Sequence, residues 1–277
     1  MLEPVQPHSP TASAADAITN ERTRTSCPNY PDWVTSSPAA LLQFGAATDV
    51  GSVRDHNEDA LLAEIPVFVV ADGMGGHAAG ELAASLTIDQ FRDLAGRTDI
   101  SREDVETRVS AANAAVLRAG EKDPSIEGLG TTVTGAVLAT VDGDLTWIVL
   151  NVGDSRTYLR RDGMLTRQTI DHSEVEELVI AGYLTAAQAR VHPRRNVVTR
   201  SIGTEPEPDL DVWLVPALPG DQLLVCSDGL TNEVDDAGLE ALLGSGAAPQ
   251  DIADGLVERA CIAGGHDNVT VIVVQLG

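Results

Sequence analysis

The stretch Val67-Phe68-Val69-Val70-Ala71-Asp72-Gly73-Met74-Gly75-Gly76-His77 runs from five apolar residues through one acid into a glycine-rich segment. The apolar residues predict a buried strand, and the glycines predict a tight loop that leads into a helix. A side chain at the end of a buried strand is held in place, while the loop beyond it stays open to ligand. Two kinds of site fit this stretch alone: a nucleotide-binding phosphate loop, or a carboxylate that holds hard metal ions.

The composition is that of an acidic globular protein. The chain has 277 residues, 43% of them hydrophobic, and can therefore bury a substantial core. Its formal net charge of −24 at pH 7 argues against a nucleic-acid binder, because phosphate contacts need a basic face, and it favours binding of divalent cations. Three cysteines at irregular spacing fit neither a disulfide framework nor a zinc site.

The sequence predicts neither a membrane span nor a secretory signal. The longest apolar runs, such as residues 65–71, are much shorter than the roughly 20 residues that cross a bilayer. The N-terminus has no basic patch followed by an apolar core, so we expect a cytoplasmic protein.

The order of predicted elements favours two sheets with helices outside them. Residues 1–40 hold six of the fourteen prolines and no periodic apolar pattern, which predicts a flexible N-terminal leader before a domain at 41–277. Asp142-Gly143 and Asp162-Gly163 each join two strand-like segments, as in a hairpin, so the sheets should be largely antiparallel. Helices are predicted at 77–95, 101–120, 175–181, 185–190, 236–243 and 249–263.

Three aspartates, Asp72, Asp228 and Asp267, lie at predicted strand boundaries beside glycine or asparagine. Each Asp-Gly pair alone is also the ordinary sequence of a turn. Two of the three acids end apolar runs, however, and an unpaired carboxylate at a buried strand end is costly unless a cation binds it. Ligands that are all oxygen select magnesium or manganese over zinc.

Other chemistries fit the chain poorly. Residues 73–78 match the loose G-x-G-x-x-G/A pattern, but two helices are predicted to follow where a nucleotide-binding unit needs a parallel strand, and Asp72 would face the pyrophosphate. A cysteine phosphatase needs arginine six residues after its nucleophile, and Trp33, Asn232 and Asp267 occupy those positions. The serine-hydrolase pattern G-x-S-x-G is absent.

Six short motifs in this order resemble those of the bacterial PP2C (PPM) metal-dependent serine/threonine protein phosphatases. They are Arg54-Asp55-His56-Asn57-Glu58-Asp59, Ala71-Asp72-Gly73-Met74-Gly75-Gly76, Gly130-Thr131-Thr132, Gly153-Asp154-Ser155-Arg156, Ser227-Asp228-Gly229-Leu230 and Asp267-Asn268-Val269-Thr270. The resemblance covers residues 44–277. It implies a four-layer α-β-β-α sandwich of class α+β, with two central antiparallel sheets flanked by helices.

The resemblance also implies a centre of two Mn²⁺ or Mg²⁺ ions. Asp72 would bridge both ions, the Gly73 carbonyl would bind one, and Asp228 and Asp267 would complete the ligands. Asp154, together with Asp228, resembles the site of a third ion. Two ions of this kind activate a water molecule and offset charge on the phosphoryl oxygens.

The remaining implied roles concern substrate and surroundings. Arg54 would bind the substrate phosphate, Glu58 and Asp59 would hold water molecules around the metals, and Asn268 would lie just outside the ligands. A segment at 171–203, here called the flap, would lie beside the site. Its Arg194 and Arg195 have two interpretations, contact with acidic phosphopeptides or solvated surface.

The predicted function is hydrolysis of phosphoserine and phosphothreonine in proteins, with phosphoproteins and serine/threonine kinases as partners and a monomeric chain. Met74 occupies the place where some animal relatives have a histidine general acid, and His77 is expected to cap or pack the following helix. Two alternatives stay open: a phosphoprotein-binding regulator of the same fold, and an anti-sigma-pathway phosphatase.

Overall fold

The computed structural model describes residues 41–76, 78–123, 126 and 128–277. The predicted leader at 1–40 and His77 lie outside the described residues. Within the described part of the chain, no helix is long and apolar enough to cross a membrane.

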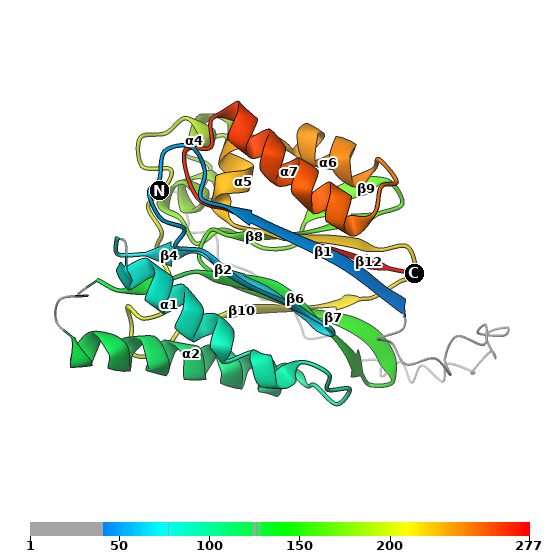
Figure 1. Cartoon of the computed structure of the whole chain (residues 1–277), viewed down its shortest axis with the longest axis horizontal. Helices are drawn as coiled ribbons and strands as arrows, with labels where there is room; N and C mark the ends of the chain where they lie inside the picture. Colours follow the sequence, from blue (N-terminus) through cyan, green and yellow to red (C-terminus); the bar gives the residue numbers. More distant parts are fainter. Residues whose placement is uncertain (1–40, 77, 124–125, 127) are drawn as a thin grey trace, which may run out of the picture. The chain divides into compact units, whose positions relative to one another are not determined.

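Two five-stranded antiparallel sheets form the centre of the domain (Figure 1). The first sheet has the order β1 (Leu42–Asp49), β12 (Val269–Leu276), β11 (Gln222–Cys226), β8 (Arg156–Arg161) and β9 (Met164–Arg167). The second has the order β10 (Asp211–Pro216), β7 (Asp144–Val152), β6 (Val133–Val141), β3 (Val67–Ala71) and β2 (Ala60–Glu64). A two-stranded ladder, β4 (Gly73–Met74) with β5 (Gly130–Thr131), lies at the end of the second sheet.

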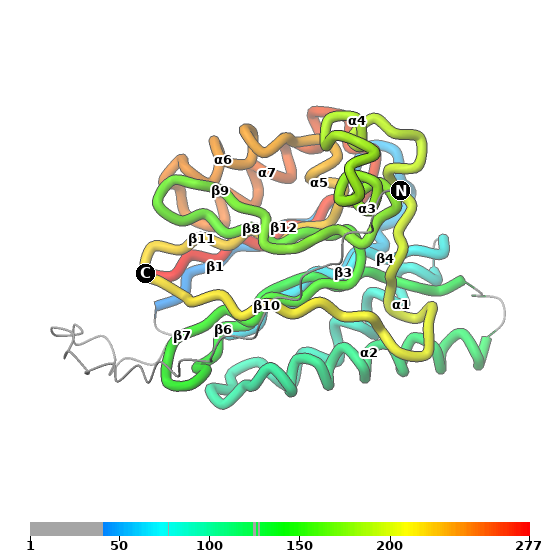
Figure 2. The backbone as a smooth tube through the Cα atoms, turned by 180° about the vertical axis from the view of Figure 1, so that it is seen from behind, coloured from blue at the N-terminus to red at the C-terminus, as the bar shows by residue number. Residues whose placement is uncertain are grey.

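Helices cover the outer face of each sheet (Figure 1). The second sheet is covered by α1 (Ala78–Asp89), the short 3-10 helix η3 (Arg92–Leu94) and α2 (Arg102–Lys122). The first sheet is covered by α5 (Asp228–Glu233), α6 (Asp236–Leu243) and α7 (Pro249–Ala263). The flap contains α3 (Glu174–Ile180) and α4 (Ala186–Arg190), and Figure 2 shows both beside α5 at one end of the sheets.

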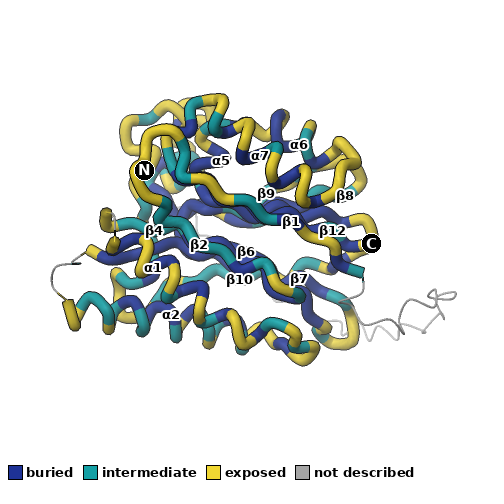
Figure 3. Tube along the Cα trace, viewed as in Figure 1, coloured by how far each residue is buried: buried dark blue, intermediate teal, exposed yellow. Residues whose placement is uncertain are grey.

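The core has three layers of buried apolar side chains, which explains why all five residues of β3 are buried. Side chains alternate between the faces of a strand, so Phe68 and Val70 pack between the sheets, while Val67 and Val69 pack beneath α1 and α2. Figure 3 shows the buried residues on the inner strands and on the inward sides of the helices. The predicted four-layer sandwich is confirmed.

Local sequence signals account for many of the element boundaries. Asp142 and Asp162 have positive φ values of 54° and 53°, as does the glycine after each, so both predicted hairpins form. Ser101 and Asp104 form a reciprocal capping box at the start of α2.

Helix α5 was not predicted by the sequence. It is only six residues long, too short to show a helical apolar period, and it begins at the Asp228-Gly229 pair, which alone has the sequence of a turn. Its first residue is one of the candidate ligands, so the helix bears directly on the site.

Candidate metal centre

Four aspartates meet at one end of the two sheets. Asp72 follows β3, Asp154 follows β7 after one glycine, Asp228 follows β11 and begins α5, and Asp267 precedes β12. All four line a pocket of about 330 Å³. The pocket is also lined by residues predicted for the site, namely Arg54, Glu58, Gly73 and Asn268.

The backbone of Asp72 is fixed by two threonines that follow α2 in the chain. Its N–H donates to Thr132 Oγ1 at 3.0 Å, and its carbonyl accepts from the Thr132 N–H at 2.9 Å and from Thr131 Oγ1 at 2.8 Å. Thr132 Oγ1 also lies 2.8 Å from Ser155 Oγ, next to Asp154. Both backbone polar groups of Asp72 are therefore satisfied, and its side chain is left to face the pocket.

Gly73 and Gly80 have no room for a side chain. A Cβ on Gly73 would collide with the carbonyl oxygens of Glu58 and Gly80, and a Cβ on Gly80 would collide with the Glu58 carboxylate. The loop after β3 therefore packs directly against Glu58 and the first turn of α1. This close approach explains Gly73 without any nucleotide phosphate.

Asn268 holds the loop that carries Arg54 and Glu58. Its Oδ1 accepts from the Glu58 N–H at 2.8 Å, and its Nδ2 donates to the carbonyls of Val50 and His56, each at 2.9 Å. The adjacent Asp267 accepts from Arg54 Nη2 at 2.7 Å. The loop and the start of β12 are thus joined at the pocket wall.

Asp59 lies outside the residues that line the pocket. Its Oδ2 accepts from Ser227 Oγ at 2.8 Å, whereas its buried Oδ1 has no hydrogen-bond partner among the described atoms. Burial raises the Asp59 pKa to about 7, hydrogen bonds from Thr270 and Ser227 oppose the rise, and the charge of Asp228 adds to it.

The clustered carboxylates repel one another. Burial raises the pKa of Asp72 well above its usual value, and the charges of Asp59, Asp228 and Asp154 raise it further. Burial also raises the pKa of Asp154, and the charge of Asp228 raises it further. The pKa of Asp228 is likewise raised by burial and then by the charge of Asp267. A cation among these groups would remove the repulsion.

The residues present fit a pair of hard divalent cations. The donors are carboxylates and backbone carbonyls, the oxygen set that Mg²⁺ and Mn²⁺ prefer. Across residues 41–76, 78–123, 126 and 128–277, no three acidic, histidine or cysteine side chains already converge as a closed ligand group. The carboxylates line the pocket, and ions of this kind would keep several water ligands there.

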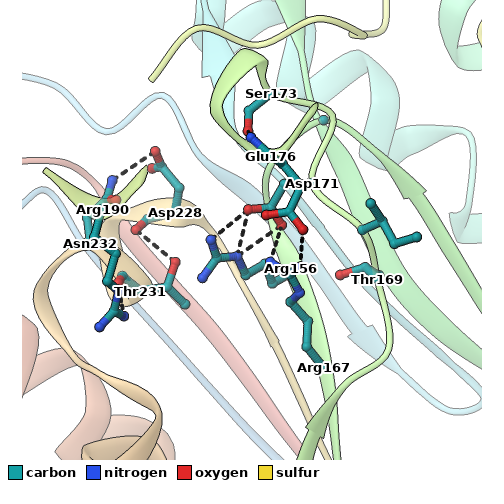
Figure 4. Close-up of polar contacts among 12 residues, drawn as sticks. Arg156, Arg167, Thr169, Asp171, Ser173, Glu176, Arg190, Asp228, Thr231 and Asn232 are labelled. Carbon is teal, nitrogen blue, oxygen red and sulfur yellow. Dashed lines mark hydrogen bonds and ion pairs between the residues drawn. The ribbon is translucent and has the colours of Figure 1, made fainter. Parts of the chain in front are cut away.

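A network of arginines and acids borders the site on the flap side (Figure 4). Arg156 donates to both carboxylate oxygens of Asp171, at 2.6 to 3.0 Å, and to the Tyr158 hydroxyl at 3.3 Å. Arg167 bonds Asp171 as well, and its other nitrogen pairs with Glu176. Burial lowers the Arg156 pKa, but the charges of Asp171 and Tyr158 and the hydrogen bonds to both residues together outweigh burial, so the pKa is raised. Asp171 therefore fixes the position of the Arg156 guanidinium, whose charge acts on Asp154.

Sequence reasoning did not assign roles to Ser155, Ser227, Asp171 or the two threonines before β6. Arg167 lies only four residues before Asp171, but most of their other partners are distant along the chain, and local pattern does not report such contacts. One signal was available: Gly130-Thr131-Thr132 places two hydroxyl side chains just before a mostly apolar strand.

Comparison with known proteins agrees with this architecture. The family model described as "Protein phosphatase 2C" matches residues 52–247. The "Serine/threonine phosphatase stp" of Listeria innocua is 36% identical over 239 residues, covering 82% of this chain and 93% of that protein. The "Serine/threonine protein phosphatase PstP" of Mycobacterium tuberculosis is 40% identical over 243 residues, covering 85% of this chain and 45% of PstP.

Solved structures are similar as well. The crystal structure of Mycobacterium tuberculosis PstP/Ppp matches with a TM-score of 0.80 and 37% identity, covering 85% of this chain and 98% of that one. A PstP catalytic domain described as being in complex with two manganese ions matches with a TM-score of 0.76 and 36% identity, covering the same shares. The sandwich and its carboxylate pocket are thus those of a protein phosphatase. The chain belongs to the protein phosphatase 2C family.

Proposed function

We propose that this chain hydrolyses phosphoserine and phosphothreonine in proteins with the help of two Mn²⁺ or Mg²⁺ ions. The observation that supports this proposal most is that Asp72, Asp228 and Asp267 line one pocket, with Arg54 at its wall. The names of the similar Listeria and Mycobacterium proteins support the substrate class, and the manganese complex of PstP supports the metal.

In this proposal the carboxylates of Asp72, Asp228 and Asp267 and the Gly73 carbonyl hold the two ions. When bound, the ions lower the pKa of a water molecule and offset charge on the phosphoryl oxygens. Asp154 with Asp228 would hold a third ion at the flap side. Residues 41–277 would form the phosphatase domain.

Arg54 would bind the phosphate. A guanidinium presents two parallel N–H groups, which match two phosphoryl oxygens, and it stays charged at any working pH. Asn268 donates hydrogen bonds to the Val50 and His56 carbonyls and so fixes the loop that carries Arg54. The backbone from which the guanidinium reaches the pocket is therefore held in place. Glu58 and Asp59 would hold water molecules around the ions.

We assign proton donation to the leaving group to none of the side chains named above. Met74 lines the pocket, and a thioether has no proton to donate. Solvent water is the donor that we propose.

The test uses purified protein, p-nitrophenyl phosphate and a phosphothreonine peptide, with manganese and then with excess chelator. We expect hydrolysis that needs the metal, and loss of activity to background in Asp72→Asn. Asp162→Asn is the matched control, because it makes the same change in a hairpin turn, where asparagine tolerates the positive φ of 53°. Activity that persists with chelator would contradict the two-metal proposal, and phosphopeptide binding without turnover would point to the regulator instead.

A further inference from the structure

A larger groove continues from the metal pocket along the flap. Its volume is about 1260 Å³, and it is bordered by β8, by the flap helices α3 and α4, and by α5. Five residues line both the groove and the pocket, namely Arg54, Asp154, Asn196, Asp228 and Asp267. A chain segment attached to a group in the pocket could therefore lie in the groove without crossing a barrier.

The arginines of this groove differ in whether their charge is already neutralised. Arg156 and Arg167 are held by Asp171 and Glu176 and are not available to a ligand. Arg190 and Arg195 are exposed, and among the described residues neither has a carboxylate partner. The hydrogen bond found for the Arg190 guanidinium is a long one of 3.4 Å to the Thr231 carbonyl, across the groove on α5 (Figure 4).

Unpaired arginines are unusual in a chain with 42 acidic and 18 basic residues. Arg194, which the sequence offered as a peptide contact, is instead paired with Glu174. In the described ranges, the other basic side chains without an ion pair are Arg118 and Lys122 on α2 and Arg259 on α7, and none of them lines the groove. Free positive charge near the site is thus concentrated in Arg190 and Arg195.

We propose that the groove binds the polypeptide next to the phosphorylated residue and prefers an aspartate or glutamate there, with its carboxylate against Arg190 and Arg195. The position of the phosphorylated residue in the pocket rests on the proposed function. Arginine suits this role because its planar fork matches a carboxylate with two hydrogen bonds. Val191, which is 80% exposed between the two arginines in the chain, offers apolar contact to the rest of the segment.

The expected preference is moderate, because both arginines are solvated. Exposed ion pairs are individually weak, so two of them correspond to roughly a 30-fold gain in affinity at most. Such a gain should shrink as salt is added, since salt screens exposed charges.

The test measures peptide binding, so the result does not depend on hydrolysis of the peptide. Fluorescently labelled peptides carry a phosphonate mimic of phosphothreonine that cannot be hydrolysed, with alanine, glutamate or lysine placed at each flanking position in turn. Anisotropy titrations with the manganese-loaded protein should give tighter binding for glutamate than for alanine at one or more positions, and weakest binding for lysine. The double variant Arg190→Glu/Arg195→Glu should reverse this order.

The double variant Arg118→Glu/Arg259→Glu is the matched control, because it makes the same two charge reversals at exposed sites on α2 and α7 and should keep the wild-type order of affinities. Equal affinities of the wild type for the three peptide types, or an unchanged order in the double variant, would overturn the inference. Hydrolysis of a neutral phosphothreonine peptide by the same preparation reports separately on the proposed function. The peptide preference can thus fail while the phosphatase activity stands.

Discussion

At the scale of single residues, the site depends on buried hydroxyl groups that hold the backbone of the loops with the candidate ligands. Thr132 accepts from the Asp72 N–H and reaches Ser155 with the same oxygen, so one side chain links the loops that carry Asp72 and Asp154. Thr132 is 1% exposed, and water cannot replace it. Its effect on the metal centre should therefore be separable from that of the ligands themselves.

Thr132→Val should show this, because valine keeps the shape and removes the hydroxyl. The Asp72 N–H would lose its partner, and a buried unsatisfied donor costs about 1–3 kcal/mol, so we expect that loss in urea unfolding. We also expect weaker manganese binding by calorimetry, since the Asp72 backbone is no longer held. Thr146→Val is the control, because Thr146 is also buried but its hydroxyl, among the described residues, bonds only the nearby Asp144 carbonyl. Equal effects of the two changes would contradict the role given to Thr132.

At the scale of elements, α5 connects two candidate ligands. Asp228 is its first residue, and at its other end Glu233 accepts from the backbone N–H of His266 at 3.3 Å and lies 2.6 Å from His266 Nδ1. The segment before Asp267 is therefore tied to the helix that begins at Asp228. This short helix sets the spacing of the two acids.

Glu233→Ala should loosen that tie. We expect manganese affinity to fall about tenfold, the lower end of what loss of a group supporting a metal ligand costs. Calorimetric titration with manganese would measure it. Glu258→Ala, an exposed position on α7, is the matched control and should bind as the wild type does. Unchanged affinity in Glu233→Ala would show that the Asp267 loop holds its position alone.

The start of α2 gives a prediction on pH. Hydrogen bonds from Ser101 hold the Asp104 pKa down to about 2, below its ordinary value of 3.8. A carboxylate with a lowered pKa in the folded state stabilises it above pH 3.8, and this stabilisation is lost as the pH falls from 3.8 towards 2. Asp104→Asn should therefore lower the melting temperature at pH 7, with a difference that narrows below about pH 4. Glu103→Gln, in the same helical turn, serves as the control for loss of charge, and a pH-independent difference would refute the assignment.

The elements also show what a sequence can and cannot predict. The two Asp-Gly hairpins and the helix that follows Ser101 depend on neighbours in the chain, and both were predicted. The order of the acids along the motifs predicted the candidate ligands, which the structure brings to one pocket. The ties from Thr132 to Asp72 and from Arg156 to Asp171 depend on tertiary contact, which local pattern does not report.

At the scale of the whole molecule, the carboxylate cluster that would bind metal also destabilises the folded state when metal is absent. The chain carries a net charge of −24, and its buried acids repel one another at the pocket. Groups arranged for a charged ligand are a cost to the fold when that ligand is absent. The stability of the domain should therefore depend strongly on metal.

Metal removal should lower the melting temperature of the wild type, and Asp72→Asn should depend less on metal. With excess chelator we expect the variant to melt higher than the wild type, because one buried like charge is gone. With manganese the wild type should gain more, since a ligand at a hundredfold excess over its dissociation constant stabilises by about 2.7 kcal/mol. Calorimetric scans with and without manganese would measure both. A variant that melts lower in both conditions would contradict the repulsion argument.

Strand β12 is the last element of the domain along the chain, yet it lies between β1 and β11 and pairs with β1 over all eight residues from Leu42 to Asp49. Asp267 stands just before it. While a ribosome is still translating the residues up to α7, the first sheet therefore lacks an inner strand and the pocket lacks one acid. The pocket should therefore bind metal only after β12 has left the ribosome and paired with β1 and β11.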